Sequence, residues 1–125
     1  MDLRPDHIGI VVSDLERSKS FYRALGFADV SERVMPGKTL SFMRLGDLEI
    51  ELFAYEEPVS APGSPDPVLG FKHLALETQD IDAAFSELRQ AGVIGEGIAI
   101  REMPDGWRLL FFPDPDGMEI EIKQA

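Results

Sequence analysis

The sequence contains an internal repeat, in which the segment His7–Phe27 returns as His73–Val93 without a gap. In both copies a histidine opens a short apolar run, a residue that can cap a helix follows, and a glycine closes the pattern. The matching pairs are His7 and His73, Ile8 and Leu74, Ile10 and Leu76, Asp14 and Asp80, Leu15 and Ile81, Ser20 and Ser86, Arg23 and Arg89, and Gly26 and Gly92. A second match joins residues 47–52 to residues 117–122. Such a duplication predicts two units with the same fold.

The composition of the 125-residue chain limits its partners and the kinds of site it can form. The formal net charge of -11 argues against nucleic acid or an anionic membrane surface as a partner, since both attract basic proteins. The absence of cysteine excludes disulfides, thiolate metal sites and cysteine nucleophiles. No apolar run is long enough to span a membrane, and the N-terminus lacks the sequence features of a signal peptide. We therefore expect a cytoplasmic protein, in which any metal has nitrogen and oxygen ligands.

Hydrophobic periodicity predicts the same elements in both halves. Two amphipathic patterns predict helices, Leu15–Leu25 capped by Ser13 or Asp14 and Ile81–Ala91 capped by Asp80. The predicted strands are Asp6–Val12, Phe27–Val34, Thr39–Leu45, Leu48–Tyr55, Lys72–Glu77, Gly97–Glu102, Arg108–Phe112 and Met118–Lys123. Each half therefore has the order βαβββ.

This element order predicts an α+β fold in a single domain, residues 1–125. The first unit covers residues 1–57, a proline-rich linker covers 58–70, and the second unit covers 71–125. We expect the two units to form one curved mixed sheet, an incomplete barrel, with the helices on its convex face.

Strand alternation predicts that histidines and glutamates share the sheet face that the helices leave free. The residues placed there are His7, Glu51, His73 and Glu121. Carboxylates inside a fold are costly unless they are paired or bind a metal, and imidazole with carboxylate suits a first-row divalent ion. The alternative is that the histidines are structural and the glutamates solvated, because antiparallel sheets often have one wet face. We interpret the neighbouring Glu49 and Glu119 as solvated residues.

A family resemblance extends over essentially the whole chain. It rests on His7 opening the first strand, on residues 14–18 leading into residues 21–27, on Ile50-Glu51-Leu52, on His73-Leu74-Ala75-Leu76, and on residues 114–121 with the sequence DPDGMEIE. In this order and spacing, these motifs resemble those of the glyoxalase I/vicinal oxygen chelate superfamily, and of the lactoylglutathione lyases in particular.

The resemblance implies a metal site and an assembly. It assigns His7, Glu51, His73 and Glu121 as ligands of one divalent ion, which would be nickel, cobalt or zinc, with iron or manganese as alternatives. Glutamate at position 51 matches the glyoxalase I pattern. Ring-cleaving dioxygenases and fosfomycin-modifying relatives have no carboxylate there, and methylmalonyl-CoA epimerases are expected to have glutamine. The resemblance also implies a homodimer.

The chain departs from the glutathione-dependent members of this family at two positions. Arginine is expected where Val11 stands and asparagine where Tyr55 stands, so the usual anchors of the glutathione carboxylate are absent. The thiol part of the substrate is therefore left open. Candidates for substrate contact, each with an exposed strand residue as the alternative interpretation, are Val11, Phe53, Tyr55, Trp107 and Arg108, together with Arg44 and Arg101.

The predicted reaction is proton transfer at a carbon next to a carbonyl, on an α-hydroxycarbonyl or hemithioacetal, through a metal-bound enediolate. We expect Glu121 to be the principal base and Glu51 its pseudo-symmetric partner. The alternatives are a non-catalytic protein that binds drugs or other small molecules, an epimerase, or an Fe(II) dioxygenase of the same superfamily. In every case the partner is a small molecule.

Overall fold

The computed structural model describes residues 1–2, 4–60 and 69–125. The chain divides into two compact units, Met1–Ala61 and Pro62–Ala125. The first contains β1 (Ile8–Val12), α1 (Leu15–Ala24), β2 (Ala28–Met35), β3 (Lys38–Leu45) and β4 (Leu48–Tyr55). The second contains β5 (His73–Thr78), α2 (Ile81–Gln90), β6 (Arg101–Glu102), β7 (Arg108–Pro113) and β8 (Glu119–Gln124). Of the predicted linker 58–70, residues 61–68 lie outside the described residues.

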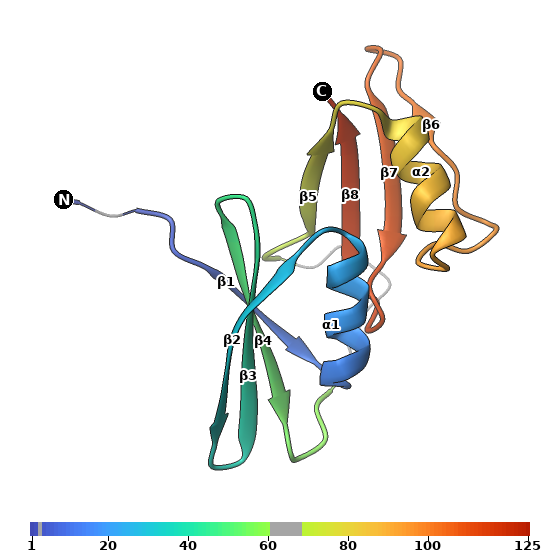
Figure 1. The fold of residues 1–125 in the computed structure, drawn as a ribbon. Helices are drawn as coiled ribbons and strands as arrows, with labels where there is room; N and C mark the ends of the chain where they lie inside the picture. The colour runs from blue at the N-terminus through green and yellow to red at the C-terminus, as the bar shows by residue number, and fades with distance from the viewer. Residues whose placement is uncertain (3, 61–68) are drawn as a thin grey trace. The chain divides into compact units, whose positions relative to one another are not determined.

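Both units have the predicted βαβββ order and the same strand arrangement (Figure 1). The first sheet has the order β1-β4-β3-β2, and the second has the order β5-β8-β7-β6. In each sheet the first strand lies parallel to the last, and the other neighbours are antiparallel. The α+β class with two βαβββ repeats is therefore confirmed. The hydrogen bonds form two four-stranded sheets instead of one, because each first strand pairs with the last strand of its own unit.

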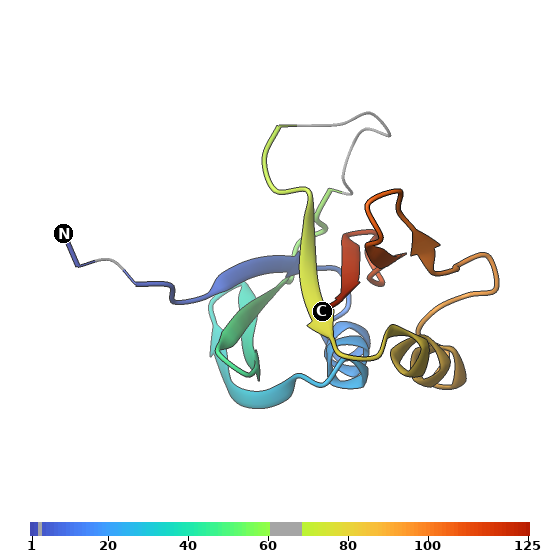
Figure 2. The ribbon, with the colours of Figure 1, turned by 90° about the horizontal axis from the view of Figure 1, so that it is seen from above.

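Each helix packs against its own sheet (Figure 2). In the first unit, Tyr22 of α1 and Ile50 of β4 are fully buried. In the second unit, Ile81 of α2 and Leu110 of β7 are fully buried. The apolar faces of helix and sheet thus form the core of each unit, and the other sheet face is left for the candidate site.

Local signals in the sequence set the helix ends. The Asp14 and Asp80 carboxylates each accept the backbone N–H of the third helical residue at 3.0 Å, so these aspartates are the N-caps. Gly26 and Gly92 follow the helices with φ of 105° and 72°, a conformation that favours glycine.

One predicted strand is much shorter than expected. The sequence predicts a strand at Gly97–Glu102, but only Arg101–Glu102 pairs with β7. The preceding segment turns back on itself, since the Ile98 N–H bonds to the Gly95 carbonyl at 3.3 Å. Glycine is unfavourable inside a strand, which explains why this segment does not extend β6.

A buried lysine, which the sequence analysis did not identify, ties α1 to the sheet. The Lys19 ammonium lies 3.1 Å from the Glu32 carboxylate on β2, and the lysine side chain is only 11% exposed. Ser41 on β3 donates a hydrogen bond to the same carboxylate oxygen at 3.3 Å. The hydrogen bond between Lys19 and Glu32 raises the pKa of the lysine and lowers the pKa of the glutamate. Both groups are therefore charged at neutral pH.

We expect Glu32→Gln to lower the free energy of unfolding at pH 7, because it leaves the buried Lys19 charge with only the exposed carboxylate of Glu16, 3.7 Å away. The folded protein lowers the pKa of Glu32 below its ordinary value of 4.5. The contribution of this group is thus present above pH 4.5 and is lost as the pH falls through the folded pKa. Urea unfolding at a series of pH values should show variant and wild type converging in acid. Glu87→Gln, at an exposed position of α2, is the control, and a gap that persists in acid would contradict the ion pair.

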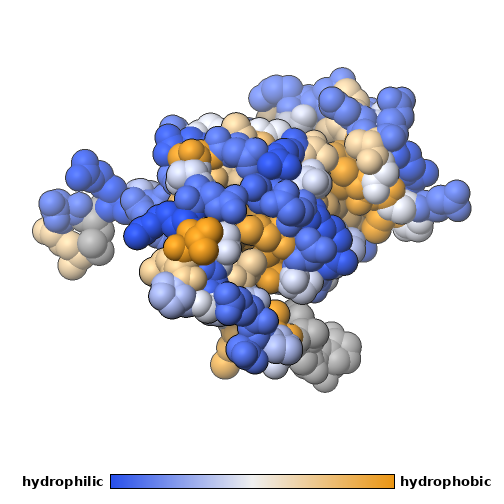
Figure 3. Space-filling view, turned by 60° about the horizontal axis from the view of Figure 1, so that its bottom comes forward, coloured by the Kyte–Doolittle hydropathy of each residue, from blue (hydrophilic) through white to orange (hydrophobic). Residues whose placement is uncertain are grey.

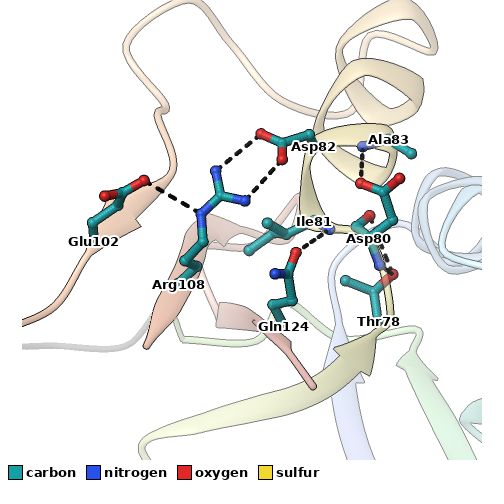
Figure 4. Close-up of polar contacts among 8 residues, drawn as sticks. All are labelled: Thr78, Asp80, Ile81, Asp82, Ala83, Glu102, Arg108 and Gln124. Carbon is teal, nitrogen blue, oxygen red and sulfur yellow. Dashed lines mark hydrogen bonds and ion pairs between the residues drawn. The ribbon is translucent and has the colours of Figure 1, made fainter. Parts of the chain in front are cut away.

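A polar network joins the start of α2 to strands β6, β7 and β8 (Figure 4). Arg108 donates two hydrogen bonds to the Asp82 carboxylate, at 2.8 and 3.0 Å, and its Nε lies 3.4 Å from Glu102. The hydrogen bond from Arg108 lowers the pKa of Asp82. On β8, Gln124 accepts the Ile81 backbone N–H at 3.0 Å. The network therefore fixes the position of α2 on its sheet.

We expect Arg108→Gln and Asp82→Asn each to lower the urea concentration at which half of the protein is unfolded, because each removes the same bidentate contact. The double variant should be about as stable as the less stable single variant, since one interaction cannot be lost twice. Glu96→Gln, an exposed change in the same unit, should leave the unfolding midpoint unchanged. Losses that simply add in the double variant would show that the two side chains do not interact.

Candidate metal centre

The first histidine–glutamate pair lies on β1 and β4. The strand begins at Ile8, so His7 directly precedes it instead of lying within it. The register places Gly9 beside Glu51. Because residues two apart share a strand face, His7 lies diagonally next to Glu51. The His7 Nε2 atom is 2.8 Å from Oε2 of Glu51, whose side chain is only 9% exposed.

The second unit repeats this geometry. His73 is the first residue of β5, and the register places Ala75 beside Glu121. The His73 Nε2 atom is 2.8 Å from Oε2 of Glu121, whose side chain is 13% exposed. The same two atoms therefore meet at the same distance in both units, because the same parallel register brings them together.

A second carboxylate holds the other ring nitrogen of each histidine. The Nδ1 atom of His7 is hydrogen-bonded to Asp6, and that of His73 lies 3.3 Å from Glu119. The hydrogen bond to Asp6 raises the pKa of His7 above 6.5; burial opposes this effect, and the charge of Glu51 adds to it. A carboxylate on Nδ1 orients the ring and leaves Nε2 facing the glutamate, an arrangement found in metal-binding histidines.

Glu49 and Glu119 are not the plain solvated residues that the sequence analysis expected. Glu49 lies 2.7 Å from the Arg44 guanidinium, and its side chain is 21% exposed. Glu119 contacts His73, as described above. Strand alternation identified the sheet face of these glutamates but not their cross-strand partners, such as Arg44 opposite Glu49.

An aromatic ring stands beside each pair, and the sequence analysis did not identify it. Phe42 on β3 is opposite Glu51 in the register, and Phe111 on β7 is opposite Glu121. Each phenylalanine meets the histidine of its unit edge to face, with ring centroids 5.9 Å apart in the first unit and 6.0 Å apart in the second. The signal that could have found them is the hairpin register, which sets each phenylalanine across from a glutamate.

The donor atoms and their spacing fit a divalent metal ion. Imidazole nitrogen and carboxylate oxygen bind zinc and related ions at about 2.0–2.2 Å. Two such donors at right angles about an ion would be about 3.0 Å apart, close to the 2.8 Å within each pair. A hydrogen bond has the same length. Among the described residues no cluster holds three or more candidate ligands, so each unit offers two.

The motif at residues 114–121 forms the turn that leads into β8. Asp114 is buried, and its carboxylate accepts the backbone N–H groups of Asp116 and Met118 at 2.9 and 2.8 Å. These bonds fix the turn by satisfying its backbone donors. The turn sets where β8 begins, and therefore which residue of β8 occupies the position of Glu121.

Three predicted substrate contacts lie on the face of the first sheet that carries Glu51. Val11 is opposite Phe53 in the register. The Phe53 ring stacks on the Tyr55 ring with centroids 6.3 Å apart, and the Lys38 ammonium lies 5.9 Å from the Phe53 centroid. These side chains form an apolar and aromatic surface next to the pair of the first unit. Their contact with a substrate remains a prediction.

The two predicted contacts from the second unit differ in position. Trp107 is 52% exposed, and the Lys123 ammonium lies 4.0 Å from its ring centroid. Arg108 alternates along β7 with Phe111, which faces Glu121, so Arg108 lies on the helix side of the sheet. Its bonds to Asp82 give it a structural role and do not support the predicted contact with substrate.

Apolar side chains also reach the surface. On the face drawn in Figure 3, hydrophobic areas interrupt a largely hydrophilic surface. Among the exposed large apolar residues are Val11, Tyr55 and Trp107, all three predicted to contact substrate. Apolar side chains with a few polar groups among them are typical of sites for small organic ligands. Within the described part of the chain, no helix has the length and apolar character needed to cross a membrane.

Comparison with known proteins places the chain in a family. The Glyoxalase/Bleomycin resistance protein/Dioxygenase superfamily matches residues 4–122. Protein YwkD of Bacillus subtilis is 34% identical over 120 residues, which cover 93% of this chain and 92% of the relative. The human mitochondrial methylmalonyl-CoA epimerase is 28% identical over 130 residues, covering 98% of this chain and 74% of the relative. Among solved structures, the glyoxalase family protein from Enterococcus faecalis is similar with a TM-score of 0.79 and 28% identity, over 96% of both chains. The duplicated fold and the match along nearly the whole sequence show that this protein belongs to the Glyoxalase/Bleomycin resistance protein/Dioxygenase superfamily, as its motifs predicted.

Proposed function

We propose that this protein is a metal-dependent, glyoxalase I-like lyase or isomerase that moves a proton at a carbon next to a carbonyl. Its substrate would be an α-hydroxycarbonyl or a hemithioacetal. One observation carries the proposal: in both units a histidine Nε2 lies 2.8 Å from a glutamate Oε2 in the same strand register. A carboxylate holds Nδ1 in both units, which supports metal ligands over isolated surface ion pairs.

The ligands of the proposed ion are His7, Glu51, His73 and Glu121, one pair from each unit. The two pairs would combine within one chain or across a homodimer. Nickel, cobalt or zinc suits this donor set, with iron or manganese as alternatives. Such an ion, when bound, would act as a Lewis acid on the oxygen atoms of the substrate.

The two glutamates have the proposed roles in proton transfer. Glu121 takes a proton from the substrate carbon and returns it to the adjoining carbon, and Glu51 is its partner in the other unit. Their side chains are 13% and 9% exposed, so both carboxylates are largely withdrawn from water. Charge interactions with a substrate are stronger in such surroundings than in bulk solvent. The two histidines would hold their positions throughout.

An epimerase is the second candidate, and the human relative favours it because that protein is a methylmalonyl-CoA epimerase. Epimerisation also removes a proton next to a carbonyl, but returns it to the opposite face of the same carbon. Two equivalent carboxylates, Glu51 and Glu121, suit such a reaction because each could serve one face. The chain would then act on an acyl thioester instead of a hemithioacetal.

Metal binding tests the ligand set directly. We expect isothermal titration calorimetry of the metal-free protein with Zn²⁺ or Ni²⁺ to show one bound ion for every two histidine–glutamate pairs. His7→Ala and His73→Ala should each weaken binding by about 100-fold or more, since loss of a ligand costs at least as much as loss of a supporting group. Glu56→Gln, an exposed carboxylate outside both pairs, is the control. Binding of two independent ions per chain would contradict a shared site.

Turnover tests the proposed base. With Zn²⁺ or Ni²⁺ supplied, we expect the protein to convert hemithioacetals of methylglyoxal, and Glu121→Gln to reduce kcat by roughly 10²–10⁴-fold while metal stays bound. Metal analysis of the variant separates loss of the base from loss of the ion. Unchanged turnover of metal-loaded Glu121→Gln would refute the assignment. Solvent deuterium exchange into a 2-methyl acyl thioester, without hemithioacetal turnover, would favour the epimerase.

A further inference from the structure

The sheet face of the second unit that carries Glu121 also carries two cations. Arg101 on β6 is opposite Leu109 in the register, and Leu109 is opposite Lys123 on β8. The two cations thus share one row across the sheet. The next row holds Glu121 and Phe111, so the cations lie two residues along the strands from the proposed base.

Aromatic rings hold both cations. The Arg101 guanidinium carbon lies 5.2 Å from the centroid of Phe111, the ring beside the second histidine–glutamate pair. The Lys123 ammonium lies 4.0 Å from the centroid of Trp107, whose side chain is half exposed. Cation–π contacts of this kind are weak at exposed sites. They position the charges without neutralising them.

Neither cation forms an ion pair with a carboxylate in the part of the chain that the structure describes. Glu77 is opposite Lys123 in the register, but the ammonium lies over the Trp107 ring. Glu102 follows Arg101 in sequence, but its carboxylate faces Arg108. The protein has a net charge of -11, yet these two cations on the sheet face of the candidate base have no carboxylate partner among the described residues and are available to an anion.

We propose that Arg101 and Lys123 form an anion-binding subsite that selects substrates with a carboxylate or phosphate near the reacting carbon. The inference rests on the proposed function, since it gives the substrate class of that site. Neighbouring strands are about 4.8 Å apart, so the two Cα atoms, which are two strands apart, lie roughly 10 Å from each other. Both side chains are long enough to leave these rings and meet on one anionic group at that separation. The subsite supplies the anchor that Val11 and Tyr55 do not.

Thiols of different charge test the subsite, because each forms a hemithioacetal with methylglyoxal. Mercaptoacetate adds a carboxylate, 2-mercaptoethyl phosphate adds a phosphate, and 2-mercaptoethanol adds no charge. With the zinc-loaded protein, we expect kcat/KM to be at least about tenfold higher for an anionic adduct than for the neutral one, because only the anionic adduct gains a charge-assisted contact. Which anionic thiol is preferred distinguishes carboxylate from phosphate recognition.

The variants Arg101→Gln and Lys123→Gln should each lower the ratio of anionic to neutral kcat/KM by about tenfold. Arg89→Gln is a matched control, because Arg89 lies 4.8 Å from the Phe85 centroid in the same unit but on helix α2. This control should keep the wild-type ratio. An equal ratio in the wild type and in both subsite variants would overturn the subsite.

A binding measurement separates failure of the subsite from failure of the proposed function. Trp107 is the only tryptophan and contacts Lys123, so its fluorescence reports on anions at this position. If no hemithioacetal is converted, the proposed function fails. The anion-binding subsite is still supported if succinate or inorganic phosphate gives a saturable fluorescence change that Arg101→Gln abolishes. The subsite is refuted if neither anion changes the fluorescence or if the variant responds like the wild type.

Discussion

The parallel pairing of the first and last strands in each unit is the interaction on which the candidate site depends. Because β1 lies beside β4 and β5 beside β8, the histidine that opens one strand meets the glutamate in the middle of the other. Parallel neighbours require a crossover, and here the helix carries the chain from the first strand to the far edge of the sheet, from which the next strands return to the last one. A shift of β4 or β8 by one residue would turn its glutamate to the helix side of the sheet. Other features help to hold the strands in this register. They are the capped helices, the turn at Asp114 and the buried ion pair of Lys19.

Periodicity and repetition were enough to predict much of this arrangement. The repeat predicted two βαβββ units, and the period of two along the strands placed Glu51 and Glu121 on the face away from the helices. Asp80 and Gly92 likewise marked the ends of α2 correctly within one residue. These features depend on contacts between near neighbours in sequence or on a pattern that appears twice, so a single sequence contains the information.

The parts that were missed depend on contacts between distant segments. Nothing in the neighbouring sequence distinguishes Lys19 from an exposed helical lysine, because its partner Glu32 lies on the strand that follows the helix. Nor does the sequence indicate that Asp82 on α2 binds Arg108, which was also a predicted substrate contact. The division into two sheets also could not be read from alternation, which reveals the faces of a strand but not its neighbours.

The two copies of the unit have the same backbone plan but different charges around it. In the first, Arg44 beside the pair is neutralised by Glu49, whereas in the second, Arg101 and Lys123 rest on aromatic rings. Duplication by itself would give the proposed shared site two interchangeable ends, in which an elongated molecule could lie in either direction. Unequal charges give such a site a polarity. A ligand with one anionic end would then have a preferred orientation, and each of the two glutamates would face a different atom of it.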